Sequence, residues 1–163
     1  MRYHNITKDD MLNGEGLRVV LWLSGCVHAC KGCHNQETWD IQGGLVFDEA
    51  AKQELFEELS KDYVSGITLS GGDPLHPQNA EEVESLVKEI HKKFPLKTIW
   101  LYTGYVYEEI EHLGVLEVVD VLVDGKFIEA QKDVKLHWKG SMNQKTIDVK
   151  QSRKLQRIVL VEG

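Results

Sequence analysis

The sequence predicts an α/β protein whose mostly parallel sheet forms a partial, open β/α barrel. Stretches typical of strands and of helices alternate along the 163 residues. The strand stretches are almost continuously apolar, which is typical of parallel strands that are buried on both faces. A closed eight-stranded barrel usually needs about 250 residues, so any barrel formed by this chain has to be partial.

The expected elements follow one another in a regular order. Residues 17–23 are rich in β-branched and large apolar side chains and are followed by Ser24-Gly25, which predicts the first strand. Further strands are expected at 66–70, 97–102 and 118–123, and helices at 48–60, 79–94 and 106–113. Asp48 is the expected N-cap of the first helix. Residues 146–149 and 157–161 could form two more strands, and we expect one domain spanning residues 1–163.

The net charge of the chain argues against two classes of partner, nucleic acids and anionic membranes. The chain has 19 Lys+Arg against 26 Asp+Glu, which gives a formal net charge of −7. Nucleic acids and anionic membranes attract basic surfaces, so neither is expected as a partner. No stretch approaches the roughly 18 apolar residues that span a bilayer, and the first residues lack the apolar run of a secretory signal. The sequence therefore predicts cytoplasmic localisation.

All three cysteines lie within eight residues, as Cys26, Cys30 and Cys33. An odd set packed this closely is a poor disulfide framework and a good ligand set. Three thiolates in a C-x3-C-x2-C pattern can hold three irons of a 4Fe-4S cluster and leave the fourth iron open. The alternative is a zinc site with His28, His34 or His4 as the fourth ligand, which would make the chain a non-catalytic zinc-binding interaction module.

Polar or glycine-rich clusters follow each of the expected parallel strands. The cysteines follow the first strand, Gly71-Gly72-Asp73 the second, Thr103-Gly104 the third and Asp124-Gly125-Lys126 the fourth. The carboxyl ends of parallel strands form the site in such sheets, so these clusters are expected to converge on one rim. Paired glycines let the backbone approach a ligand closely, and Asp73 can pair with an ammonium group. A plain tight turn remains the alternative for Gly71-Gly72-Asp73, and an ordinary hairpin turn for Asp124-Gly125-Lys126.

The cysteine pattern after the first strand resembles the hallmark of the radical S-adenosylmethionine (SAM) superfamily. That resemblance implies a 4Fe-4S cluster held by Cys26, Cys30 and Cys33, whose open iron binds the amino and carboxylate groups of SAM. Reductive cleavage of SAM would then give methionine and a 5′-deoxyadenosyl radical that abstracts hydrogen. Gly32 stands where the superfamily often has an aromatic residue, and this departure resembles the activating proteins of anaerobic ribonucleotide reductases.

The same resemblance implies a set of SAM-binding residues. Gly71-Gly72-Asp73 resembles the Gly-Gly-Glu motif of the superfamily, in which backbone carbonyls and the acid bind the SAM ammonium group. The segment after the cysteines is similar to that of glycyl-radical activases, which implies that Gly32 and His34 line the adenine through their backbone.

Two later segments extend the resemblance over nearly the whole chain. Asp124-Gly125-Lys126 resembles an Asp-x-Lys element of glycyl-radical activases, which implies that Lys126 contacts SAM and that Asp124 polarises the site. Gly140-Ser-Met-Asn-Gln144 resembles a late segment of the reductase activators, and its spacing alone suggests no role.

The function implied by the resemblance is activation of an anaerobic (class III) ribonucleoside-triphosphate reductase. The chain would be a radical SAM oxidoreductase that generates a glycyl radical on this protein partner and takes its electron from a donor such as reduced flavodoxin or ferredoxin. The alternatives are an activase of another glycyl-radical enzyme and a small stand-alone radical SAM enzyme. The chemistry belongs to the cluster and SAM, so no side-chain general base is expected.

Overall fold

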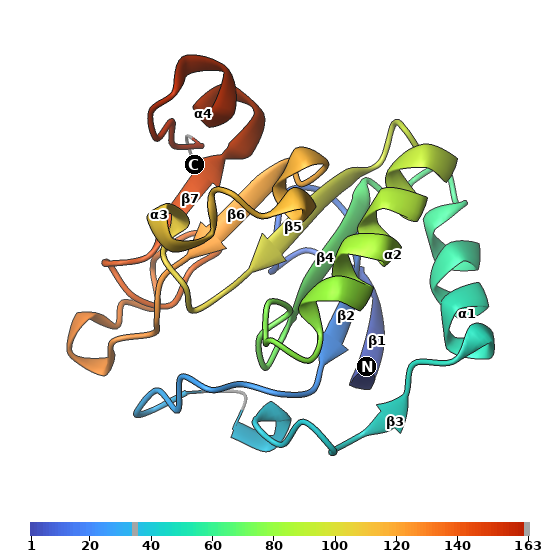
Figure 1. Ribbon diagram of the computed structural model, residues 1–163, viewed down its shortest axis with the longest axis horizontal. Coiled ribbons are helices and arrows are strands. Elements are labelled where there is room, and N and C mark those ends of the chain that lie inside the picture. The colour runs from blue at the N-terminus through green and yellow to red at the C-terminus, as the bar shows by residue number, and fades with distance from the viewer. Residues whose placement is uncertain (34–35, 162–163) are drawn as a thin grey trace.

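The computed structural model describes residues 1–33 and 36–161, and one mixed sheet runs through it (Figure 1). The sheet that these residues form has seven strands in the order β3-β1-β2-β4-β5-β6-β7. The strands are β1 Arg2–Asp10, β2 Arg18–Leu23, β3 Leu45–Val46, β4 Gly66–Gly71, β5 Thr98–Tyr102, β6 Val121–Asp124 and β7 Lys145–Asp148. The strands at the two ends of this order do not pair, so the sheet is open. The predicted α/β class with a partial barrel is confirmed.

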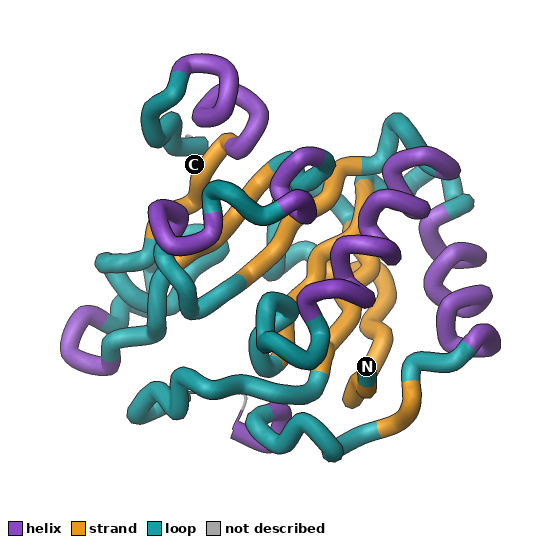
Figure 2. Tube along the Cα trace, viewed as in Figure 1, coloured by secondary structure: helices purple, strands orange, loops and turns teal. Residues whose placement is uncertain are grey.

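The parallel part of the sheet consists of β2, β4, β5 and β6, which lie side by side. Val20 of β2 lies opposite Thr68 of β4, and Thr68 lies opposite Trp100 of β5. β1 and β7 flank this part and run antiparallel to their neighbours. The carboxyl ends of the four parallel strands therefore lie at one edge of the sheet, where long loops follow them (teal in Figure 2).

Helices cover one face of the sheet. They are α1 Glu49–Leu59, α2 Ala80–Lys93 and the short α3 Tyr107–Ile110, and α4 Val149–Leu155 follows the last strand. Asp48 caps α1 as predicted, because its Oδ1 accepts a hydrogen bond from Ala51 N at 2.9 Å. The buried residues of α2 recur at helical spacing: Val83, Leu86, Val87 and Ile90. No helix formed by the described residues is long and apolar enough to cross a membrane.

The core lies between these helices and one set of alternating strand residues. The fully buried strand side chains that face the helices are Val19, Leu21, Leu23, Ile67, Leu69, Ile99, Leu101 and Leu122. The intervening residues point to the opposite face because side chains alternate along a strand. None of the helices formed by residues 1–33 and 36–161 packs against that face. Trp100 of this second face contacts Trp138 instead, with ring centroids 4.9 Å apart.

Arg18 ties the amino-terminal ends of the parallel strands together on the second face. Its side chain is fully buried, and its guanidinium donates to neutral acceptors only. Nε donates to Thr68 Oγ1, Nη1 to Glu15 O and Thr98 Oγ1, and Nη2 to Ile67 O and Thr98 O, all at 2.8 to 3.0 Å. Burial lowers the pKa of Arg18 to about 10, and the negative charge of Asp120 opposes that shift.

The structure differs from the prediction at both ends of the chain. β1 is an additional strand whose residues are mostly polar, so its sequence lacks the apolar pattern of the inner strands. The strand considered for residues 157–161 is wrong apart from a single bridge between Leu160 and Ile147. β6 begins at Val121 rather than residue 118, because Gly114–Glu117 forms a 3-10 helix that ends at Val118.

Replacing Arg18 by Met is expected to lower the free energy of unfolding by about 3 kcal/mol, because buried carbonyl acceptors would lose their donors. Urea unfolding of the anaerobically purified protein measures the change. Arg157→Met is the control, because Arg157 is exposed and such surface changes usually stay within about 0.5 kcal/mol. Equal stability of Arg18→Met and the wild type would mean that the cost of burying the charge outweighs its hydrogen bonds.

Candidate functional site

The cysteine loop leaves the arrowhead of β2 at the carboxyl edge of the sheet (Figure 1). Cys26, Cys30 and Cys33 are half-buried and form no disulfides. The segment that follows the cysteines supports the beginning of the loop. Gly25 N donates to Thr38 O at 2.6 Å, and Cys26 N donates to Trp39 O at 3.1 Å. These two backbone hydrogen bonds fix the start of the loop, including the first cysteine.

The loop takes a sharply turned path around the Cys26 sulfur. Gly25, Ala29 and Gly32 all have left-handed backbone angles, with φ of 104°, 49° and 75°. The backbone N–H groups of His28 and Ala29 donate to the Cys26 sulfur. Burial raises the pKa of the Cys26 thiol, and these two N–H groups oppose that shift by favouring the thiolate. The N–H groups are therefore directed at the atom that would bind iron.

One buried carboxylate joins the loops that follow β2, β4 and β5. The Asp73 side chain is fully buried and accepts hydrogen bonds from Leu75 N at 2.8 Å, Thr103 Oγ1 at 2.9 Å and Gly104 N at 3.0 Å. Its Oδ2 is also 2.6 Å from His28 Nε2. Asp73 thus binds donors of its own protein, whereas the sequence predicted a partner in the SAM ammonium group.

Gly71 and Gly72 bring the end of β4 against the cysteine loop. Gly71 has φ of 103°, and a Cβ there would lie 2.5 Å from both backbone N and O of Leu23. A Cβ on Gly72 would overlap the carbonyl oxygen of Gly25 and come within 2.7 Å of Thr38 O. The close approach predicted for these glycines therefore exists, and the backbone that they approach is that of the cysteine loop.

The turn after β6 separates the two residues predicted there. Asp124 is buried and accepts hydrogen bonds from Tyr107 N at 2.8 Å and Lys145 N at 3.1 Å, so it joins β6 to α3 and β7. Burial raises the pKa of Asp124, and these two backbone donors oppose the shift. Lys126 is exposed, and no hydrogen bond or ion pair to another described residue is found for its ammonium group.

The Gly140–Gln144 segment holds this turn in place. Gln144 Nε2 donates to Gly125 O at 2.9 Å, and Asn143 Nδ2 donates to Lys126 O at 2.8 Å. Gln144 Oε1 accepts from Gly140 N at 2.9 Å and Ser141 N at 3.1 Å, which shapes the segment itself. Spacing alone suggested no role for these residues, whereas in the structure they support the backbone of Gly125 and Lys126.

A cavity of about 380 Å³ lies beside Cys33 on the face of the sheet that no helix covers. It is lined by Leu12, Asn13, Trp22, Cys33, Ser70, Tyr102, Phe127, Leu136, Trp138, Lys139, Gly140 and Gln144. Tyr102 Oη donates to Trp138 O at 2.5 Å, which fixes the loop that forms one wall. Gly32 lies near this loop, since a Cβ there would be 3.0 Å from the Glu129 side chain. His34, the remaining predicted residue, lies outside the described residues.

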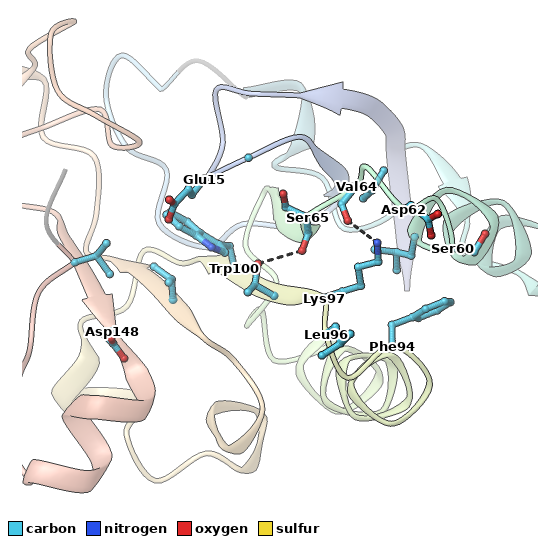
Figure 3. A pocket seen from close by; sticks show the side chains of 15 residues that line it. Glu15, Ser60, Asp62, Val64, Ser65, Phe94, Leu96, Lys97, Trp100 and Asp148 are labelled. Atoms are coloured by element: carbon cyan, nitrogen blue, oxygen red, sulfur yellow. Dashed lines mark hydrogen bonds between the residues drawn. The ribbon is translucent and has the colours of Figure 1, made fainter.

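A larger cavity of about 930 Å³ lies at the opposite edge, near the amino-terminal ends of the parallel strands (Figure 3). Glu15, Ser65, Lys97 and Trp100 are among its lining residues. Lys97 Nζ donates to Val64 O at 2.5 Å, so this lysine holds the loop between α1 and β4. This cavity includes none of the predicted site residues.

The donor set at the carboxyl edge fits a 4Fe-4S cluster. Such a cluster binds each thiolate at a different iron, so its protein ligands do not converge on one atom. Among residues 1–33 and 36–161, no three His, Cys, Asp or Glu side chains are grouped as ligands of a single metal ion. His28, one of the histidines considered for zinc, is bound to Asp73 instead.

Comparison with known proteins identifies the class to which this fold and site belong. Residues 12–147 match the family described as a 4Fe-4S single cluster domain. A protein of Enterobacteria phage T4 is 48% identical over 145 residues, which is 89% of this chain and 92% of the relative. Proteins of Haemophilus influenzae and Escherichia coli K12 are 44% and 43% identical over 148 residues, covering 88% of this chain and 96% of each relative.

All three relatives carry the name anaerobic ribonucleoside-triphosphate reductase-activating protein. The chain belongs to the 4Fe-4S single cluster domain family and, within it, to the family of these activating proteins. The resemblance seen in the sequence is confirmed, and the zinc-binding interaction module is set aside.

Sequence reasoning missed the contact between His28 and Asp73. His28 was considered only as a zinc ligand, and Asp73 only as a partner for a ligand. The signal that pointed to their meeting was positional, because both follow the carboxyl ends of neighbouring parallel strands. Their ring-to-carboxylate contact itself depends on the path of the loop between Cys26 and Cys30, which spacing does not reveal.

Gly72→Ala is expected to displace the cysteine loop and to lower the free energy of unfolding by about 2 kcal/mol. The added Cβ would overlap the backbone of Gly25 and Thr38, which cannot rotate away as a side chain can. Iron and sulfide content after anaerobic reconstitution should fall well below that of the wild type. Gly114→Ala is a matched control, since its Cβ would displace only the flexible end of the Glu84 side chain. Normal cluster content would mean that the added Cβ is accommodated without moving the cysteine loop.

Proposed function

We propose that this chain activates an anaerobic ribonucleoside-triphosphate reductase by generating a glycyl radical on it. In this proposal Cys26, Cys30 and Cys33 hold a 4Fe-4S cluster that binds SAM. The observation that carries it is the set of three thiols on a loop fixed at the carboxyl edge of an open parallel sheet, directly beside the cavity at Cys33. The names of the relatives supply the protein partner.

When bound, the cluster and SAM supply a one-electron reductive cleavage that leads to hydrogen abstraction from a glycine. The electron has to come from a donor such as reduced flavodoxin or ferredoxin. The chain itself contributes ligands, orientation and shelter from water. Backbone N–H groups of His28 and Ala29 favour the thiolate of Cys26. Asp73 holds the neighbouring loops in a fixed position relative to Cys26.

The cavity beside Cys33 is the proposed SAM site. Gly32, Gly71 and Lys126 do not line this cavity, but each is next in the sequence to a residue that does: Cys33, Ser70 and Phe127. Backbone atoms of Gly32, His34, Gly71 and Gly72 would contact the adenine and the methionine part of SAM, and Lys126 offers a cation at the rim for its carboxylate. Asp73 and Asp124 serve this site by holding loops, since both are buried and accept hydrogen bonds from donors of the protein itself. This division of roles explains why the two carboxylates are fully buried while the lysine is exposed.

The open side of the sheet is the proposed docking surface for the reductase. The two loops that line the cavity expose large apolar side chains to solvent: Met11 (68%), Leu12 (81%), Val134 (86%) and Met142 (60%). Exposed apolar groups beside a cavity are typical of a protein interface. A glycine-bearing loop of the partner would supply the target hydrogen and exclude water at once, because glycine lets a backbone enter a narrow cleft. The proposed setting is the cytosol, without a nucleic-acid or membrane partner.

The test of the proposed function is anaerobic mixing of the reconstituted chain with SAM, a reductant and a ribonucleoside-triphosphate reductase. Electron paramagnetic resonance should show a glycyl-radical doublet on the reductase. Each of Cys26→Ala, Cys30→Ala and Cys33→Ala should abolish it, because the cluster would be left under-ligated. A doublet formed only on a different glycyl-radical protein, or turnover of a free small molecule without any reductase, would support one of the two alternative enzymes.

Lys126→Ala is expected to raise the dissociation constant of SAM about tenfold, because a charge-assisted hydrogen bond contributes about 1.5 kcal/mol or more. The free energy of unfolding should stay within about 0.5 kcal/mol of the wild type, since the side chain is exposed. Isothermal titration of the reconstituted protein with SAM measures the affinity. Lys135→Ala, an exposed lysine of the neighbouring loop, is the control. Equal SAM affinity in both variants would remove Lys126 from the site.

A further inference from the structure

His28 lies between Cys26 and Cys30 and occupies a slot formed by two other loops. Its side chain is only 5% exposed, and its Nε2 lies 2.6 Å from Oδ2 of the fully buried Asp73. A histidine whose two neighbours in the sequence, Val27 and Ala29, are exposed needs a specific reason to be buried. Neither metal ligation nor the binding of SAM accounts for this one, because its ring is directed to a carboxylate of the protein.

Two further contacts show that the slot is built for a ring. Tyr105 packs edge-on against the imidazole, with centroids 4.7 Å apart. Gly104 lies against the ring so closely that a Cβ there would overlap the imidazole carbons and Nε2. The ring is therefore held by a hydrogen bond, an aromatic contact and a glycine without a side chain, all from the ends of β4 and β5.

The buried side chain of His28 holds its backbone in place, and this backbone lies next to the Cys26 sulfur. Its N–H and that of Ala29 donate to the Cys26 sulfur. Ala29 has φ of 49°, a left-handed angle that is uncommon for residues other than glycine and persists only when the surroundings impose it. Val27 and Ala29 on either side of His28 are exposed, so among these three residues only His28 anchors the turn.

We propose that His28 is a positioning residue that, through Asp73, fixes the N–H groups on the Cys26 sulfur and thereby tunes the reduction equilibrium of the cluster. The inference rests on the proposed ligation of the cluster by the three cysteines. A reduced cluster carries one more negative charge than the oxidised one, so N–H donors to its sulfur ligands favour the reduced form. Loss of the anchor should make the cluster harder to reduce.

The test compares three variants of the reconstituted protein by spectroelectrochemical titration. His28→Leu is expected to lower the reduction equilibrium constant about tenfold, which corresponds to about 59 mV for one electron. His28→Gln should recover most of the wild-type potential, since its amide N–H can reach Asp73 from nearly the position of Nε2. Val27→Ala changes an exposed side chain next to His28 without touching the contact with Asp73 and should leave the potential unchanged.

Hydrogen exchange of the peptide containing residues 26–33 provides the second measurement, with and without the cluster. His28→Leu should exchange faster than the wild type, and His28→Gln should not. If His28→Leu takes up no iron, faster exchange in its apo-protein still supports the proposal, and equal exchange overturns it. An unchanged potential in His28→Leu, or an equal shift in Val27→Ala, would also overturn it. Failure of the wild type to bind a 4Fe-4S cluster would instead contradict the ligand assignment.

Discussion

The buried carboxylate of Asp73 is the interaction on which the arrangement of the site depends. Loops from three parallel strands meet at it, through His28, Leu75 and the Thr103-Gly104 pair. Hydrogen bonds to a charged group contribute about 1.5 to 3 kcal/mol each, and a buried charge without donors is costly. The loops therefore hold one another: moving any one of them leaves the carboxylate partly unsatisfied, so the cysteines have a fixed position relative to the ends of β4 and β5.

A second layer of support lies at the turn after β6. Asp124 fixes the start of that turn from inside the protein, while Asn143 and Gln144 hold its carbonyl groups from the neighbouring loop. Several residues that resemble ligand-binding motifs are thus part of the framework, and only a few groups remain available to a ligand. Such support is needed in a small open sheet. No closed barrel surrounds its loops, so they have to be held by hydrogen bonds to one another.

The sequence was sufficient for the inner strands, the long helices and the position of the cysteines, because apolar periodicity and strand order carry that information. It was insufficient for β1, whose polar residues give no strand pattern, and for α4, which begins at Val149 and lies mostly between the two strands considered for residues 146–149 and 157–161. The roles of Asp73 and Gly72 were also beyond it. Both roles depend on which residues of another loop Asp73 and Gly72 contact. A sequence motif specifies residue types but not these contacts.

Isotope labelling can follow the hydrogen atom that is abstracted from the partner's glycine, which tests the proposed reaction most directly. Reductase produced with deuterated glycine would be activated anaerobically by the wild-type chain with SAM and a reductant, and the 5′-deoxyadenosine formed would be analysed by mass spectrometry. Deuterium is expected in that product, in step with growth of the glycyl-radical signal. Formation of unlabelled 5′-deoxyadenosine while the radical accumulates would contradict direct abstraction from the partner's glycine at this site.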